Sequence, residues 1–367
     1  MRTFAFALTL AGVAAFGLIA CGGGSNNNMS TSMSTPAASS FKATILVSDG
    51  STSAAHTDPN LQNSWGIAFN PTGVVWVSDN NTQKSTLYDG NGVVQSLVVT
   101  LPAAASGQPA SPTGIVFNTT PDFTVTANGL SGKAIFLWAT LAGTIAAWSP
   151  TVLPTQAVTV HDDGAGAAEY TGLAIASNGG ASMLYAADFH NGRVDMFDKT
   201  FTKVISAGAF TDPNLPAGFN PFGIQAVGQT IYVAYAKLGP DGHRDQSGAG
   251  NGVVDAFDTA GHLMMRVASG GALNSPWAIA LAPANFGTFS NELLIGNFGD
   301  GTINAFDPAT GAAKGTLLQA DGSKLTQPGL WGMAFGNNVD SQPSNTLFFA
   351  AGPSATTGMY GRIDMTQ

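Results

Sequence analysis

A short apolar pattern recurs six times along the chain and predicts the positions of its innermost strands. Each copy joins an aromatic residue or Thr to a Gly or Ala and then to an apolar run, as WGIAF, TGIVF, TGLAI, FGIQA, WAIAL and WGMAF. The Gly or Ala stands at positions 66, 114, 172, 223, 278 and 332, which lie 48, 58, 51, 55 and 54 residues apart. This spacing is close to the period of a four-stranded propeller blade, about 40–50 residues. The pattern therefore predicts six blades.

Turn signals between the later strands of each unit support the same interpretation. The clearest copies are LYAADFHNGRVDMFD at 184–198 and LLIGNFGDGTINAFD at 293–307, and GNGVVDAFD at 250–258 keeps the second half. Asn-Gly and Asp-Gly between apolar runs predict hairpins, because both central residues of the favoured turn need positive φ. The Asp that closes each copy is expected to cap a turn and to be structural, at Asp198, Asp258 and Asp307.

The two ends of the repeat region predict that the ring is closed. The last unit offers only three strands, at 331–335, 346–350 and 359–363. The apolar segment 41–47 precedes the first unit and can supply the missing strand, which removes an open sheet edge. We therefore expect an all-β, six-bladed β-propeller over residues 41–367. A solenoid of six units is the alternative, but neither end shows a polar capping repeat.

The N-terminus predicts export and a lipid anchor. Arg2 precedes an apolar stretch, 4–20, that has the length of a signal-peptide core. It ends in Leu-Ile-Ala-Cys, which resembles a bacterial lipobox, and Cys21 is the only cysteine of the chain. We expect 1–20 to be a lipoprotein signal peptide and Cys21 to carry the lipid. An ordinary signal peptide with an incidental cysteine is the alternative.

The segment that follows the cysteine is expected to be a tether. Residues 21–40 have no charge and almost no large apolar side chain, so they cannot bury enough surface to offset the entropy of ordering. Gly22 stands where an aspartate retains many Gram-negative lipoproteins at the inner membrane, so by resemblance the outer membrane is the expected location. The lipid anchor would make the membrane one partner of the chain.

Composition narrows the possible fold classes and binding partners. Only 10% of the residues are charged and 46 of 367 are Gly, which fits short strands and tight turns. The net charge of −9 argues against nucleic acid as a partner, since phosphates need clustered Lys and Arg. Apart from Cys21 there is no cysteine to form a disulfide, and we expect a monomer held by packing and strand pairing.

Several long motifs carry a resemblance to a known family. HTDPNLQNSWGIAFNPTG, STLYDGNG, LYAADFHNGRVDMFD and LNSPWAIALAP with LLIGNFGDGTINAFDP resemble a family of bacterial exported propellers, some of which carry PEP-CTERM sorting signals. More distantly, the chain is similar to NHL-repeat and gluconolactonase-type propellers and resembles TolB-like propellers, which implies a place in the cell envelope. The resemblance implies the fold and export, and no agreed activity.

Polar side chains gather where the predicted second strands end. Equivalent blade positions there carry Asp79, Thr140, Asp188, Tyr235 and Asn297. By resemblance to propellers of this connectivity, these turns share one face with the loops that enter the innermost strands. The candidate ligand or metal face comprises Asp58, Asp79, Asp188, His190, Asp212 and Asn297. Oxygen ligands from separate blades suit Ca²⁺, the expected ion, although Asp and Asn also serve as plain turn residues.

Two further features bear on ligand binding. Trp65, Trp277, Trp331 and Phe222 share one position before the inner-strand Gly or Ala, where they either stack on a flat ligand or pack between blades. The longest irregular insertion, 237–251, carries His243, Arg244 and Asp245 and is the candidate lid loop; a decorative surface loop is the alternative.

The sequence leaves two functions open. The first is a surface- or periplasm-facing binding or scaffold module for a protein or glycan. The alternative is a metal-dependent hydrolase of the lactonase type built on Asp79, Asp188 and Asn297. The sequence contains no GxSxG, HExxH, P-loop, GxGxxG or EF-hand motif, and its five histidines lack the paired spacing of a zinc site.

Overall fold

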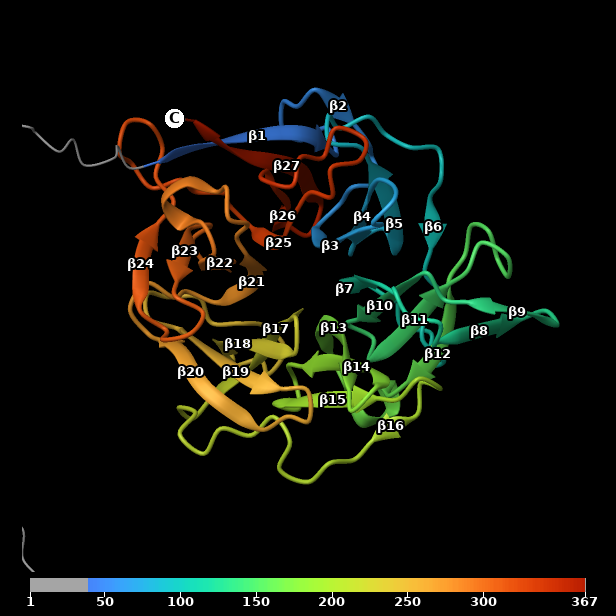
Figure 1. The fold of residues 1–367 in the computed structure, drawn as a ribbon. Helices are drawn as coiled ribbons and strands as arrows, with labels where there is room; N and C mark the ends of the chain where they lie inside the picture. Colours follow the sequence, from blue (N-terminus) through green and yellow to red (C-terminus); the bar gives the residue numbers. More distant parts are fainter. Residues whose placement is uncertain (1–38, 367) are drawn as a thin grey trace, which may run out of the picture. The chain divides into compact units, whose positions relative to one another are not determined.

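The computed structural model describes residues 39–366, which form 27 strands arranged mainly in six sheets around a central channel. Figure 1 shows the six sheets as blades, with the chain passing once around the ring from blue to red. Five blades are four-stranded antiparallel sheets and the sixth contains five strands. The predicted all-β, six-bladed propeller is confirmed.

The first three blades follow the predicted repeat. Blade 1 comprises β3 (Ser64–Phe69), β4 (Val75–Asp79), β5 (Lys84–Tyr88) and β6 (Val99–Thr100). Blade 2 comprises β7 (Pro112–Phe117), β10 (Phe136–Thr140), β11 (Thr144–Trp148) and β12 (Val158–Asp162). Blade 3 comprises β13 (Tyr170–Asn178), β14 (Ala181–Asp188), β15 (Arg193–Phe197) and β16 (Lys203–Val204).

The last three blades repeat the same order of strands. Blade 4 comprises β17 (Phe219–Val227), β18 (Thr230–Lys237), β19 (Gly252–Asp258) and β20 (Leu263–Ser269). Blade 5 comprises β21 (Pro276–Leu281), β22 (Leu293–Asn297), β23 (Ile303–Phe306) and β24 (Ala313–Thr316). Blade 6 comprises β25 (Leu330–Phe335), β26 (Leu347–Ser354), β27 (Thr357–Thr366), β1 (Ser40–Ser48) and β2 (His56–Thr57).

The N-terminal strand closes the ring as predicted. β1 pairs antiparallel with β27 from Ser40 opposite Thr366 to Ser48 opposite Met359, and Figure 1 shows the two strands side by side. Phe41 is 1% exposed and packs on the rings of Phe286 and Phe289 from blade 5. The first strand therefore completes blade 6 and buries apolar surface against its neighbour.

The repeated glycine marks the positions where neighbouring inner strands approach most closely. A Cβ added at Gly114 would lie 2.3 Å from the backbone nitrogen of Leu173, and one at Gly223 would lie 2.1 Å from the carbonyl oxygen of Trp277. Gly172 is less confined, since its nearest neighbours are atoms of Ile224 at 3.2 Å. Blade 5 carries Ala278 at this position, so the requirement for glycine varies around the ring.

The turns also follow the expected chemistry. The Asp198 carboxylate accepts the backbone N–H groups of Thr200 and Thr202, and Asp258 and Asp307 cap the equivalent turns. The hydrogen bond from the backbone N–H of Ala309 is the main cause of the lowered pKa of Asp307. The structural role predicted for these three aspartates is confirmed.

One hairpin was not predicted. β8 (Thr124–Ala127) and β9 (Leu130–Lys133) form a separate two-stranded sheet inserted between β7 and β10 of blade 2. Asn128 and Gly129 join the two strands at φ values of 52° and 77°, and the hairpin projects outward in Figure 1. Within residues 39–366, no helix is long and apolar enough to cross a membrane.

Candidate functional site

The central channel opens at two mouths with different chemistry. At one mouth the turns after the second strands meet the segments that enter the inner strands, as expected from the resemblance. A cavity of about 470 Å³ lies there, which we call the aromatic pocket. Its wall includes Asn63, Asn80, Leu141, Thr171, Phe222, Phe298, Trp331 and the turn Gly352–Ala355. This volume lies in the range of small-ligand sites, about 300–1,000 Å³.

Aromatic side chains from four blades form the base of this pocket. Trp331 stacks on Trp65 with ring centroids 3.5 Å apart, and Phe298 stacks on Trp331 at 3.9 Å. The ring centroids of Phe222 and Trp277 lie 5.6 and 5.9 Å from that of Trp331. The sequence left two roles open for these aromatic residues, lining the mouth or packing between blades. All four pack on one another, and three of them, Trp65, Phe222 and Trp331, also line the cavity.

The indole nitrogens of this cluster differ in their bonding. Trp277 donates its Nε1–H to the carbonyl oxygen of Thr171 at 3.0 Å. Within the described chain, Nε1 of Trp65 and Nε1 of Trp331 are buried and have no hydrogen-bond partner. A buried donor without a partner is costly, so these two groups remain available to an acceptor that reaches them.

The insertion in blade 4 forms one wall of the aromatic pocket. It runs between β18 and β19, and the three residues predicted for the lid, His243, Arg244 and Asp245, line the cavity. The Asp241 carboxylate accepts the backbone N–H groups of His243 and Arg244, both at 3.0 Å. This bonding fixes the tip of the loop in one turn.

The same loop brings two histidines and a carboxylate together. His190 from the β14–β15 turn lies with its ring stacked on that of His243, with centroids 4.9 Å apart. His243 Nδ1 lies 2.6 Å from Glu169 Oε1, at the entrance to β13. One donor atom of each residue lies within 4.8 Å of the other two, the one such group found among residues 39–366. Two of the predicted site residues thus meet, although they were assigned to different features.

Asp188 holds this cluster in place without joining it. Its Oδ1 accepts the backbone N–H of Glu169 at 3.1 Å, and its Oδ2 accepts the side-chain amide of Asn191 at 2.9 Å. The Arg193 guanidinium lies 3.2 Å from Oδ2. Asp188 therefore ties the segment that carries Glu169 to the turn that carries His190.

Asn297 has a similar bonding pattern in blade 5. Its Oδ1 accepts the backbone N–H of Asn274, and its Nδ2 donates to the carbonyl oxygen of Ala272 at 2.8 Å. Both ends of the amide are thus used within the loops of its own blade.

Asp79 is completely buried at the end of β4. Neither of its carboxylate oxygens has a hydrogen-bond partner within residues 39–366. Burial raises the pKa of Asp79 well above its ordinary value, which favours the neutral carboxyl group. The predicted convergence of Asp79, Asp188 and Asn297 as calcium ligands is therefore not what the structure shows, because burial and turn bonds hold each group in its own blade.

The two copies of Thr-Asp-Pro-Asn-Leu form the same kind of turn. Asp58 accepts the backbone N–H of Asn60, and Asp212 accepts that of Asn214. The second oxygen of Asp58 accepts the hydroxyl of Tyr88, and Asp212 pairs with Arg266. These two aspartates lie outside the lining of the aromatic pocket.

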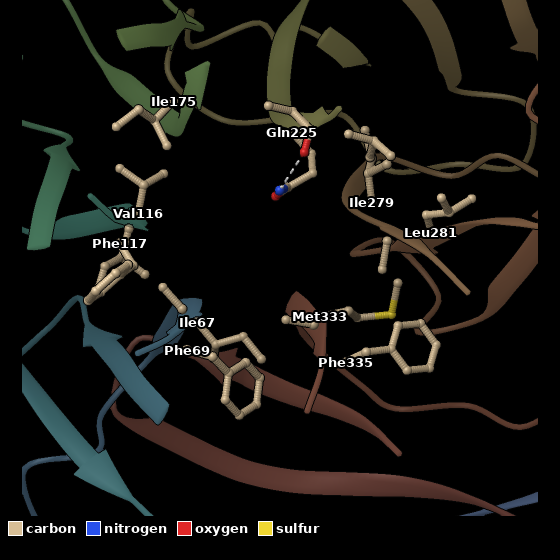
Figure 2. A pocket seen from close by; sticks show the side chains of 16 residues that line it. Ile67, Phe69, Val116, Phe117, Ile175, Gln225, Ile279, Leu281, Met333 and Phe335 are labelled. Atoms are coloured by element: carbon tan, nitrogen blue, oxygen red, sulfur yellow. Dashed lines mark hydrogen bonds between the residues drawn. The ribbon is translucent and has the colours of Figure 1, made fainter. Parts of the chain in front are cut away.

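The side chains at the opposite mouth are almost entirely apolar. Figure 2 shows the ends of the inner strands around a cavity of about 410 Å³. The side chains that line it include Ile67, Phe69, Val116, Phe117, Ile175, Ile279, Leu281, Met333 and Phe335, and Gln225 is the one with a polar side chain. Polar side chains that can orient a ligand are therefore more numerous at the aromatic pocket.

Glu169 is the one member of the histidine cluster that sequence reasoning missed. It stands immediately before the third repeat unit, where the loops that enter the inner strands were expected to reach the polar face. The sequence therefore indicated where Glu169 lies. It did not indicate that the turn after the second strand of the same blade and the inserted loop of the next blade each bring a histidine to this residue.

The fold and the two-mouthed channel define a six-bladed β-propeller. A streptogramin B lyase structure is similar, with a TM-score of 0.51 and 13% identity over 90% of this chain and 98% of that chain. The PQQ-bound aldose sugar dehydrogenase of Streptomyces coelicolor is similar with a TM-score of 0.51 and 12% identity, covering 90% and 99% of the two chains. At these identities the likeness shows the fold alone.

Closer relatives place the chain in a family. It is 34% identical to protein R648 of Acanthamoeba polyphaga mimivirus over 86% of this chain and 78% of the relative. It is 32% identical to protein L690 of the same virus over 89% and 86%. The chain belongs to the family of these two proteins, both of which are called uncharacterised. No family model matches, and the viral relatives do not support the bacterial origin expected from the resemblance.

Proposed function

We propose that this protein is a binding module that holds a sugar residue of a glycan in the aromatic pocket. The observation that carries the proposal is the combination of stacked rings and polar wall within one cavity of about 470 Å³. Sugars have an apolar face that stacks on aromatic rings and hydroxyl groups that need polar partners. The half-buried Phe298 ring and the side chains of Asn63, Arg244 and Asp245 offer both.

Tryptophan fluorescence provides the test, since Trp65 and Trp331 line the pocket. Titration of the purified protein with a panel of oligosaccharides is expected to give a saturable change for at least one glycan. Phe298→Ala removes a ring of the pocket base and should weaken binding by about two- to tenfold at least, because a stacked aromatic contact contributes about 0.5–1.5 kcal/mol beyond the area it buries.

The matched control is Phe335→Ala, which removes a half-buried ring from the opposite mouth. This variant should bind the same glycan with unchanged affinity. No fluorescence response to any glycan, or equal weakening by the two variants, would contradict the proposal. Loss of the glycan with formation of a hydrolysis product would favour the alternative, a metal-dependent hydrolase.

We also propose that the protein is exported and anchored through Cys21, which lies outside the described residues together with the signal peptide and most of the tether. The support is the lipobox-like run before the single cysteine. When the chain is expressed in a Gram-negative bacterium, Cys21→Ser should abolish incorporation of labelled palmitate and release the protein from the membrane fraction. Undiminished labelling of the Cys21→Ser variant would overturn the proposal.

A further inference from the structure

Three segments that are far apart in the sequence place metal-binding side chains at one point beside the aromatic pocket. Glu169 precedes β13, His190 lies in the turn after β14, and His243 lies at the tip of the loop between β18 and β19. Their donor atoms lie within 4.8 Å of one another. A tetrahedral ion with bonds of about 2.0–2.2 Å needs donors about 3.4 Å apart. The farthest pair therefore needs to approach by no more than about 1.4 Å, whereas His243 Nδ1 and Glu169 Oε1, 2.6 Å apart, need to separate slightly.

A hydrogen bond to the backbone orients the imidazole ring of His190 for metal binding. His190 Nδ1 lies 2.7 Å from the carbonyl oxygen of Gly242, and a carbonyl can only accept. The Nδ1 atom therefore carries the proton, and the lone pair of the neutral ring is on Nε2. Metal-binding histidines characteristically donate their second ring nitrogen to a carbonyl or carboxylate in this way.

His243 and Glu169 complete the arrangement. His243 Nδ1 lies 2.6 Å from Glu169 Oε1, so the two atoms share a proton when no metal is bound, and an ion bound by both would replace that proton. The His243 side chain is 56% exposed, so it can move toward an ion without disturbing the core. The segments that carry all three residues are fixed by other contacts, namely Asp188 for Glu169 and the His190 turn, and Asp241 for the loop tip.

We propose that Glu169, His190 and His243 bind one divalent transition-metal ion of the zinc class, which fastens the 238–251 loop to blade 3. Two imidazoles and one carboxylate suit zinc rather than Ca²⁺, which prefers six to eight oxygen ligands. Three protein ligands leave one tetrahedral position open, as in catalytic rather than structural zinc sites. His243 also lines the aromatic pocket, so the ion would hold one wall of that pocket in place. This inference goes beyond the proposed glycan binding and does not depend on it.

The test is calorimetric titration of chelator-treated purified protein with Zn²⁺, followed by Co²⁺ absorption spectroscopy. We expect one Zn²⁺ ion per chain and the intense visible bands of tetrahedral Co²⁺. His190→Ala, His243→Ala and Glu169→Gln each remove a proposed ligand, so each should weaken Zn²⁺ binding by more than the about 10- to 100-fold that loss of an outer-shell partner costs. Ca²⁺ at the same concentration should displace no Zn²⁺.

His262→Ala is the matched control, since His262 also bonds a carboxylate, that of Asp258 at 2.9 Å, but belongs to no group of three ligands among residues 39–366. It should bind Zn²⁺ as the wild type does. Circular dichroism establishes that each variant is folded, and His243→Ala is expected to fold because the His243 side chain is exposed. The proposal is overturned if the wild type binds no Zn²⁺, if folded His243→Ala binds it undiminished, or if Ca²⁺ displaces it.

Discussion

Deletion of residues 40–48 is expected to remove cooperative unfolding altogether and to cause aggregation. This segment forms β1, which buries Phe41, Leu46 and Val47 at 1%, 7% and 0% exposure. Three such side chains contribute about 5–9 kcal/mol at about 1.5–3 kcal/mol each, which is comparable to the whole stability of a domain, about 5–15 kcal/mol. The deletion also exposes the edge of β27, which then offers unpaired backbone groups to other chains. Thermal unfolding followed by circular dichroism, together with size-exclusion chromatography, measures both effects.

Deletion of 22–38 serves as the control, because the sequence predicts this segment to be a tether. Its melting temperature should match that of the intact chain within about 2 °C, since about 1 kcal/mol shifts the midpoint of a domain this large by roughly 2–4 °C. Equal melting temperatures for the two deletions would mean that β1 does not close the ring in solution.

The second large effect is expected at Gly223. In Gly223→Ala the new Cβ would lie 2.1 Å from the carbonyl oxygen of Trp277, and only a shift of the backbone of blade 4 or blade 5 relieves that clash. We expect a loss of about 3 kcal/mol or more, which lowers the melting temperature by roughly 6–12 °C. Differential scanning calorimetry of the purified variant measures it.

Gly172→Ala is the matched comparison, because it makes the same change at the same repeat position one blade earlier. Its new Cβ would meet Ile224 at 3.2 Å, and a few tenths of an ångström of movement relieve this contact. The expected loss is below about 1 kcal/mol. If the two variants have the same melting temperature, the close approach of neighbouring strands is not the reason for the repeated glycine.

The fold could be predicted because its signals are local and repeated. The inner-strand unit recurs with a glycine where the next inner strand passes closely, as at Gly114 and Gly223. The number of these units along the sequence therefore predicts the number of blades. The closing strand followed from a deficit of one strand at the C-terminus and a surplus at the N-terminus, and the structure confirms it. The Asn128-Gly129 hairpin carries a turn signal too, but it lies inside blade 2, outside the repeated pattern, and was not predicted.

The candidate site was harder to predict because it depends on contacts between blades. Asp79, Asp188 and Asn297 occupy equivalent positions, yet one is buried without partners among the described residues and the other two bond their own loops. No spacing in the sequence distinguishes these environments. His190 and His243 lie 53 positions apart in different blades, and only the course of the 238–251 loop brings them together.

The contrast between the two mouths of the channel explains why one end is the better candidate for function. Both cavities are of similar size, about 470 and 410 Å³. The aromatic pocket combines stacked rings, charged loop residues and two indole N–H groups without partners in the described chain, whereas the opposite mouth offers one amide, that of Gln225. Orientation of a ligand requires directional polar groups, and these lie at the first mouth.

A crystal structure of the protein with the glycan selected by the fluorescence titration would show where the ligand binds. We expect one sugar ring stacked at about 4 Å on the ring of Phe298, with its hydroxyl groups bonded to the wall that contains Asn63, Arg244 and Asp245. A glycan seated at the apolar mouth around Gln225, or on the outer edge of a blade, would contradict it.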